Sequence, residues 1–210
     1  MLDCSSDQEA AKSLRDIARI NKLTGARREL LHQLKQRFRA EDSFRFLDVG
    51  AASGDMARAV LASFPNARVF CIDLLLRNLQ GAPDPRVQAD AFALPFPKAS
   101  FEVVHCSLFL HHFAGEGVEE LILEMRRVAS KVVLIQDLHR HWMAYYFLPA
   151  TRFILRWHPL TVEDGKKSVA AGWRRKELER ILDRIQLLEA SKIRWHFPSF
   201  RYFIAIDSTS

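Results

Sequence analysis

The 210-residue chain has little cysteine: Cys4, Cys71 and Cys106 are its three, and no two of them form a C-x-x-C pair. An odd set without such spacing argues against a disulfide framework and against a zinc site. Cys71 and Cys106 lie inside apolar, strand-like runs, where buried free thiols are common. The cysteines therefore indicate a reducing compartment, and we expect a cytoplasmic protein.

Long apolar runs are also missing. The polar start, residues 1–13, lacks the apolar core of a signal peptide. The most apolar helical segment, residues 141–157, contains Pro149, Arg152 and Arg156, so it is too short and too interrupted to cross a bilayer. We expect no transmembrane segment, and weak contact with a membrane surface stays open.

The net charge of +6 is uneven along the chain. Residues 43–138 carry 9 basic and 11 acidic side chains, whereas residues 139–210 carry 13 basic and 7 acidic ones. A basic end can attract nucleic acid. Because acidic side chains alternate with the basic ones over residues 172–190, a solvated helix face is the better interpretation.

Apolar runs alternate with segments of helical periodicity through most of the chain. Two helices are predicted within residues 7–38, separated at Thr24 and Gly25. Five strands are predicted at residues 44–50, 67–73, 86–90, 101–108 and 131–137, with helices between most of them. This alternation predicts an α/β fold whose parallel sheet is covered on both faces. Residues 192–197 and 200–206 predict an antiparallel hairpin at the end.

Polar side chains gather where the predicted strands end, which is where parallel sheets bind ligands. Four strands end in or beside an acid: Asp48, Asp73, Asp90 and Asp137. The Gly50–Gly54 turn allows close approach of a ligand to the backbone. Asp73 is placed to bind both hydroxyls of a ribose, and Asp90 with the amides of Ala91 and Phe92 to read an adenine.

The two acids beside the turn bear on which nucleotide-like ligand is bound. Asp48 precedes the turn and Asp55 opens the following helix. A pyrophosphate prefers backbone N–H groups and a positive helix end, and two carboxylates would repel it. A sulfonium amino acid carries cationic groups that carboxylates attract. The pattern favours S-adenosylmethionine over a dinucleotide.

Four segments together resemble the class I S-adenosylmethionine-dependent methyltransferases, closest to the type 11 group that includes ubiquinone and menaquinone biosynthesis enzymes. They read FLDVGAASGD, VFCID, ADAFALPFPKASFEVVHCSLFLHHF and VVLIQDL. The resemblance covers residues 43–138 and implies a Rossmann-like sheet of order 3-2-1-4-5-7-6, with strand 7 antiparallel and helices on both sides. It implies a methyltransferase domain at residues 43–210 with a helical insertion at about 139–172, and a helical lid at residues 1–42.

The cofactor expected from these patterns and from the resemblance is S-adenosyl-L-methionine. Its predicted contacts are Asp48, Gly50, Ala51, Ala52, Gly54, Asp73, Leu74, Asp90, Ala91 and Ser107. The family loop usually reads G-x-G-x-G, and Ala52 occupies the middle glycine position. We expect the turn to persist. The departure keeps open an inactive, methyltransferase-like binding or assembly module.

Histidines follow the fourth and fifth predicted strands, and a neutral imidazole can accept a proton near pH 7. We predict catalytic roles for His111, His112 and His139. Since adjacent side chains on a helix diverge, one of His111 and His112 is expected to face the cofactor. Asp137 could orient His139, contact the substrate or simply end its strand. No metal is expected, because the H-E-x-x-H spacing is absent.

The segment after the fifth strand is the predicted acceptor region, and it resembles a bacterial subgroup associated with polyketide-type secondary metabolism. Its aromatic side chains form either an acceptor wall or ordinary core: Trp142, Tyr145, Tyr146, Phe147, Phe153 and Trp157. Arg15, Arg19 or Asn21 of the first helix could reach the cofactor or could simply pack. A wall of this kind suits an apolar or aromatic small-molecule acceptor, methylated on oxygen as a phenol, quinol or polyketide.

Two other enzyme classes fit the sequence less well. A nicotinamide-dependent reductase would need a Y-x-x-x-K pair, which the chain lacks around Tyr145 and Tyr146. An RNA methyltransferase would account for the basic end, but the N/D-P-P-Y/F motif of base-modifying enzymes is missing. The sequence leaves monomer and homodimer equally open.

Overall fold

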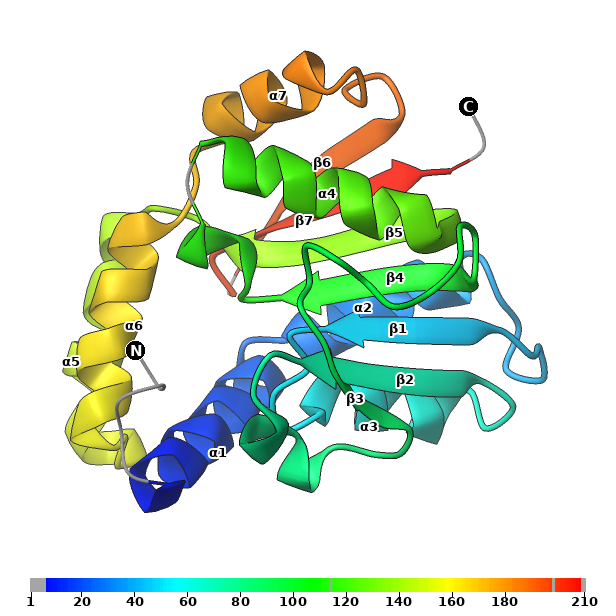
Figure 1. Ribbon diagram of the computed structural model, residues 1–210. Helices are drawn as coiled ribbons and strands as arrows, with labels where there is room; N and C mark the ends of the chain where they lie inside the picture. Colours follow the sequence, from blue (N-terminus) through cyan, green and yellow to red (C-terminus); the bar gives the residue numbers. More distant parts are fainter. Residues whose placement is uncertain (1–6, 114, 198, 209–210) are drawn as a thin grey trace.

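The computed structural model describes residues 7–113, 115–197 and 199–208. Within these ranges one sheet holds seven strands in the order β3-β2-β1-β4-β5-β7-β6 (Figure 1). The strands are β1 (Arg45–Val49), β2 (Arg68–Asp73), β3 (Arg86–Gln88), β4 (Phe101–Ser107), β5 (Ala129–Leu138), β6 (Ser191–His196) and β7 (Arg201–Asp207). The predicted strand order is confirmed.

Strand direction also follows the prediction. β1 to β5 pair in parallel, whereas β7 lies antiparallel between β5 and β6. The chain passes from β1 outward to β2 and β3 and then returns to β4 on the other side of β1. Such a reversal is the place where open α/β sheets bind ligands, at the carboxyl ends of the strands. β3 ends at Gln88, so Asp90 lies in the following loop.

The central strands are buried on both faces, which explains their continuous apolar sequences. Helices α4 (Glu116–Val128) and α7 (Arg175–Arg184) cover one face, and α2 (Ala26–Lys35) and α3 (Asp55–Ser63) cover the other (Figure 1). In α4 the buried residues recur at positions i, i+3, i+4 and i+7: Val118, Leu121, Ile122 and Met125. This spacing places one apolar stripe against the sheet.

Three helices lie beyond the carboxyl ends of the strands: α1 (Asp7–Leu23), α5 (Trp142–Leu155) and α6 (Pro159–Ala171) (Figure 1). The Asp16 carboxylate of α1 accepts hydrogen bonds from the His158 amide at 2.8 Å and the Thr161 hydroxyl at 3.1 Å, so α1 is fixed to the start of α6. Pro149 lies inside α5 and does not end it. Short 3-10 helices, η2 (Leu76–Gly81) and η3 (Leu110–His112), follow β2 and β4.

None of the described helices has both the length and the apolar character needed to span a bilayer.

Candidate functional site

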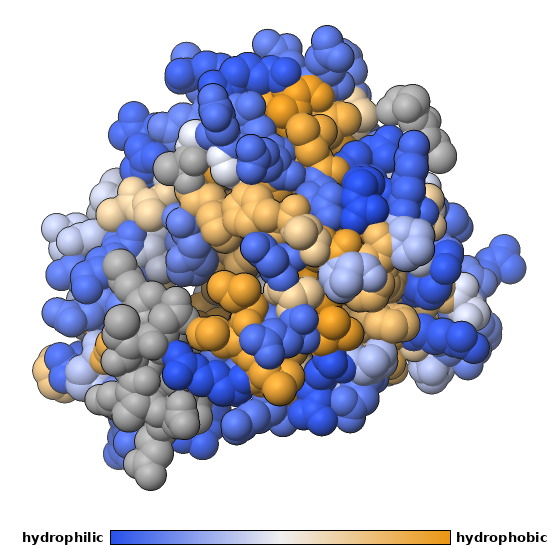
Figure 2. Space-filling view, viewed as in Figure 1, coloured by the Kyte–Doolittle hydropathy of each residue, from blue (hydrophilic) through white to orange (hydrophobic). Residues whose placement is uncertain are grey.

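A cavity of about 690 Å³ opens at the carboxyl ends of the strands. Its walls come from the strand ends on one side and from α1, α5 and α6 on the other. The space-filling view shows a hollow bordered by apolar surface, while the rim of the molecule is largely hydrophilic (Figure 2). Protein sites for small ligands have volumes of roughly 300–1,000 Å³ and are mostly apolar, as this one is.

The turn between β1 and α3 borders the cavity with its backbone. Gly50, Ala52 and Gly54 all have left-handed φ angles, of 65°, 47° and 69°. At Gly54 a Cβ would lie 2.7 Å from the Cα of Ala82, so glycine is required there by space as well as by conformation. The turn forms with alanine at position 52, as expected, although an L-residue is strained in this conformation.

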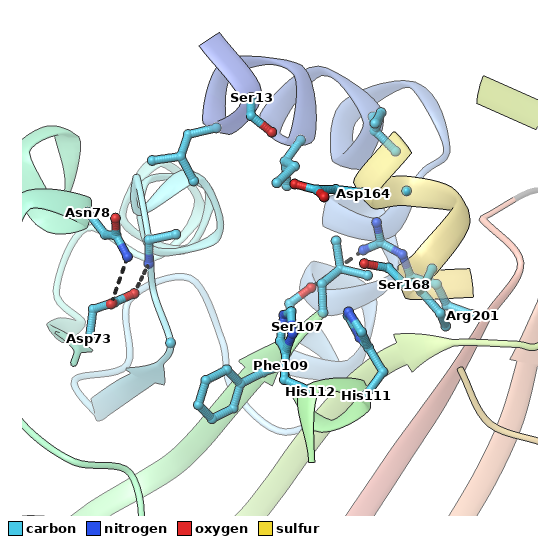
Figure 3. A pocket seen from close by; sticks show the side chains of 18 of the residues that line it. Ser13, Asp73, Asn78, Ser107, Phe109, His111, His112, Asp164, Ser168 and Arg201 are labelled. Atoms are coloured by element: carbon cyan, nitrogen blue, oxygen red, sulfur yellow. Dashed lines mark hydrogen bonds between the residues drawn. The ribbon is translucent and has the colours of Figure 1, made fainter. Parts of the chain in front are cut away.

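Asp73 is held in a fixed position at the end of β2. Its Oδ1 accepts hydrogen bonds from the Leu75 amide and the Asn78 side chain, both at 3.0 Å, and its Oδ2 accepts the Ala52 amide at 3.2 Å. A carboxylate oxygen can accept two hydrogen bonds, so Oδ2 keeps room for a ribose hydroxyl. Figure 3 shows Asp73 and Asn78 together at one end of the cavity.

The structure separates the predicted cofactor contacts into two groups. Seven line the cavity: Gly50, Ala52, Asp73, Leu74, Asp90, Ala91 and Ser107. The exposed Asp90 accepts the Phe92 amide at 2.9 Å, so that amide is used within the turn and not for an adenine. Asp48, Ala51 and Gly54 are not part of the cavity wall.

The two acids beside the turn are used for packing. The buried Asp48 carboxylate accepts a hydrogen bond from Nδ1 of His105 at 2.8 Å, inside the sheet. Asp55 accepts hydrogen bonds from Asn21 and pairs with Arg27 at 3.1 Å. Neither carboxylate is presented to the cavity, because each already has a partner on a neighbouring element. The acids that do line it are Asp73, Asp90 and Asp164.

A buried histidine–aspartate pair lies in the middle of the cavity wall. Nδ1 of His111 donates to Oδ1 of Asp137 at 2.8 Å, and the Phe109 and Leu138 amides donate to the same carboxylate at 3.0 and 2.7 Å. Burial acts to raise the pKa of Asp137, but His111 and these amides outweigh it and leave the pKa below its ordinary value. In the neutral form of His111 this hydrogen bond assigns the proton to Nδ1, which makes Nε2 the nitrogen that can accept a proton.

His111 and His112 both line the cavity, with their ring centroids 4.3 Å apart. Figure 3 shows both between the Asp73 end and the Arg201 end. The expectation that one of them alone would face it is wrong: adjacent residues of a 3-10 helix are about 120° apart, yet both side chains reach the cavity wall.

His139 occupies a different place. It is not among the residues that line the cavity, and its ring packs 4.9 Å from that of Tyr202 and 5.2 Å from that of His141. Burial lowers its pKa, with further contributions from His141 and Arg174. Asp137 contacts His111 and is not placed as the partner of His139. A role for His139 at the reacting atoms is therefore not supported by this geometry.

Of the two alternatives for the six aromatic side chains, acceptor wall or ordinary core, the wall fits Phe147 alone. Phe147 lines the cavity, but Trp142, Tyr146 and Phe153 are 68%, 58% and 86% exposed on the outer side of α5. Trp157 is buried beneath the guanidinium of Arg19. Helical rotation explains the difference, because only one stripe of α5 can face the cavity. The apolar part of the wall includes Leu138, Ala144, Phe147, Leu148, Val169 and Phe200.

The first helix contributes residues that the sequence analysis did not select. One face of α1, with its following turn, lines the cavity with Ser13, Leu14, Ile17, Ile20 and Thr24. Arg15 is not on that wall, and Arg19 donates instead to the Leu155 carbonyl. The helical spacing of Ile17, Ile20 and Thr24 could have revealed this face. Arg201, another cavity residue, sits in a β-run that gave no such signal.

Comparison with known proteins adds to this geometry. Residues 47–133 match the family model for a methyltransferase domain, of the type 11 group. A malonyl-[acyl-carrier protein] O-methyltransferase from Halorhodospira halophila is 37% identical over 94 residues, which are 41% of this chain and 31% of that protein. The chain thus spans about a third of the length of this curated relative. These matches support a class I S-adenosylmethionine-dependent methyltransferase of the type 11 group.

Solved structures share the fold. A SAM-dependent methyltransferase from Aquifex aeolicus has a TM-score of 0.58 at 14% identity, covering 91% of this chain and 97% of its own. Magnesium protoporphyrin IX methyltransferase from Synechocystis PCC 6803, solved with bound S-adenosylhomocysteine, has a TM-score of 0.58 at 14% identity, covering 93% and 84%. At these identities the likeness concerns the fold.

The cofactor of this methyltransferase family is S-adenosylmethionine, and the residues of the cavity fit it. The volume is sufficient, and the Asp73 carboxylate faces a space where a ribose can donate hydrogen bonds. The left-handed turn at Gly50 and Ala52 leaves the backbone of the wall open to the ligand. Asp73 and this turn are the groups that would hold it.

Proposed function

We propose that this protein methylates an oxygen atom of a small, largely apolar or aromatic acceptor, such as a phenol, quinol or polyketide, using S-adenosylmethionine. The observation that carries the proposal is the His111–Asp137 pair on the wall of an otherwise apolar cavity. When bound, the cofactor supplies an electrophilic methyl group. The acceptor oxygen must lose its proton to receive the methyl group. The protein's part is to supply the base that takes this proton.

His111 is the general base that we propose for the acceptor hydroxyl. Asp137 holds the Nδ1 proton, so the unprotonated Nε2 is the atom that would accept the proton. General bases contribute roughly 10²- to 10⁴-fold to such reactions. The apolar side chains around it exclude water and keep the acceptor in place.

Oxygen is favoured as the target by two independent points. A base is needed for a hydroxyl, and the structure offers one beside the cavity. The curated relative, similar over 94 residues, is named as an O-methyltransferase. Its malonyl acceptor concerns that protein, and the phenol, quinol or polyketide proposed here rests on the apolar wall of this chain.

The first test is isothermal titration with S-adenosylmethionine, S-adenosylhomocysteine and NADH. We expect micromolar binding of both sulfur compounds and none of NADH. Asp73→Ala should weaken that binding by at least roughly 10-fold, since a charge-assisted hydrogen bond contributes about 1.5–3 kcal/mol. Asp84→Ala is the matched control, because Asp84 is exposed, pairs with Arg86 and is not on the cavity wall.

Activity is tested next by S-adenosylhomocysteine release with a panel of phenols and quinols. His111→Gln should reduce turnover by roughly 10²-fold or more while cofactor affinity stays within about threefold. Absence of binding of either sulfur compound would favour a binding or assembly module. Binding of NADH alone would favour a reductase.

A further inference from the structure

Arg201 is a buried cation on the cavity wall. It is the first residue of β7 and pairs in register with Leu138 of β5 and His196 of β6. Only 1% of its surface is exposed, yet it is one of the residues that line the cavity. Figure 3 shows its guanidinium beside Ser107, at the end of the cavity opposite Asp73.

The partners of this guanidinium are neutral. Nη2 donates to the Asn21 side-chain oxygen at 2.7 Å, and Nη1 lies 3.4 Å from the Ser107 hydroxyl. Nε has no hydrogen-bond partner. The two nearby carboxylates are paired elsewhere, Asp55 with Arg27 and Asp137 with His111. Among the described residues none forms an ion pair with Arg201. A buried charge without a carboxylate partner is costly, so its retention calls for a ligand.

The charge of Arg201 persists at neutral pH. Burial lowers its pKa, although the nearby Asp137 and Asp55 act to raise it, and the result is a pKa of about 10. Around the described wall of the cavity, Arg201 is the single lysine or arginine. The acidic side chains on the same wall are Asp73, Asp90 and Asp164. An anionic ligand group in this cavity therefore has one cation to bind.

We infer that Arg201 is a carboxylate-binding residue, with Asn21 and Ser107 orienting its guanidinium at the cavity wall. The carboxylate belongs either to the amino-acid end of the cofactor or to the acceptor. A guanidinium is suited to this group because it presents several N–H donors in one plane. The inference rests on the proposed function, since it concerns ligands of the same cavity.

The first arm compares two ligands on the unmodified protein, so it does not depend on the folding of a variant. The probes are S-adenosylhomocysteine and its decarboxylated analogue, which differs only by loss of the carboxylate. If the cofactor supplies the anion, calorimetry will show roughly 10- to 100-fold weaker binding of the analogue. Arg201→Gln should then remove this difference, and Arg201→Lys should restore part of it. Arg194→Gln, in exposed β6, is the matched control.

The second arm tests the acceptor as the source. With S-adenosylhomocysteine saturating, binding of 3-phenylpropionate is compared with that of its neutral amide. Tighter binding of the carboxylate, lost in Arg201→Gln but kept in Arg194→Gln, supports the inference even if the first arm shows no difference.

Two results would overturn the inference, and they are distinguishable. If the unmodified protein binds S-adenosylhomocysteine but discriminates neither pair of probes, Arg201 is not a carboxylate site and the proposed function stands. If it does not bind S-adenosylhomocysteine at all, the proposed function fails and the inference fails with it.

Discussion

Asp137→Asn tests the hydrogen-bond network on which the candidate base depends. Each carboxylate oxygen of Asp137 serves two donors: Oδ1 accepts from Nδ1 of His111 and the Leu138 amide, and Oδ2 from the Phe109 and His111 amides. An asparagine can present one acceptor oxygen only. Its NH₂ group must face two donors in either orientation.

The cost follows from that count. With the amide nitrogen toward Phe109, two buried backbone donors lose their acceptor, at about 1–3 kcal/mol each. With the amide nitrogen toward His111, the imidazole must shift its proton to Nε2, and the cavity loses its base. In the first case we expect the free energy of unfolding to fall by about 2–5 kcal/mol. In the second, turnover should fall by roughly 10²-fold or more.

The assay is urea unfolding at pH 7, with Asp183→Asn on the exposed side of α7 as the control. The control should stay within about 0.5 kcal/mol of the unmodified protein. If Asp137→Asn also stays within about 0.5 kcal/mol of the unmodified protein, and its turnover is unchanged, the proposed role of the Asp137 hydrogen bonds is refuted.

The pH dependence of this stability has a definite sign. Because the pKa of Asp137 in the folded protein lies below its ordinary value of 3.8, its ionised form is favoured by folding. The stability that the carboxylate contributes is present in full above pH 3.8 and is lost as the pH falls from there through the folded pKa. The stability gap between the unmodified protein and Asp137→Asn should therefore shrink as the pH falls below 4, as thermal unfolding at each pH would show. A gap that grows below pH 4 contradicts this assignment.

Three further predictions concern the turn and the acceptor end. Gly54→Ala should destabilise by about 2–4 kcal/mol and Gly25→Ala by only about 1–2, since both are left-handed but a Cβ at Gly54 also meets Ala82; equal losses in urea unfolding would be contrary evidence. Ala52→Gly relieves left-handed strain of about 1–2 kcal/mol but adds an entropy cost of about 0.5–1 kcal/mol. The free energy of unfolding should therefore rise by up to about 1 kcal/mol, and a fall of that size would contradict the strain at Ala52. Ser168→Phe should fill the cavity beside α5 and abolish acceptor binding while S-adenosylhomocysteine affinity, measured by calorimetry, stays within about threefold; retained turnover would place the acceptor elsewhere.

Most of the fold was predictable because its signals are local. The break at Thr24 and Gly25 separates α1 from α2, as predicted, since Gly25 adopts the left-handed conformation that starts α2. The hairpin of β6 and β7 was also visible, because two β-rich runs enclose a short turn. Strand order needed the resemblance to the family, because periodicity does not say which strands become neighbours.

The site was less predictable because it depends on side-chain direction and on partners far along the chain. Asp48 and Asp73 both end strands, but Asp48 turns toward His105 within the sheet and Asp73 toward the turn. Asp137 and His111 are 26 residues apart, and Arg201 and Asn21 are 180 apart. No local pattern encodes contacts across such separations. Which stripe of α5 faces the cavity depends on the rotation of the helix, and its aromatic content does not fix that rotation.

The first helix is bound to the rest of the cavity at two points, and this decides what it can do. Near its middle, Asp16 accepts hydrogen bonds from His158 and Thr161 of the α6 region. Near its end, Asn21 accepts from Arg201 and donates to Asp55. Hydrogen bonds to charged groups contribute about 1.5–3 kcal/mol each, so lifting α1 would cost several such bonds. The helix therefore acts as a fixed wall of the site, and the size of the acceptor is limited by the cavity as it stands between α1, α5 and α6.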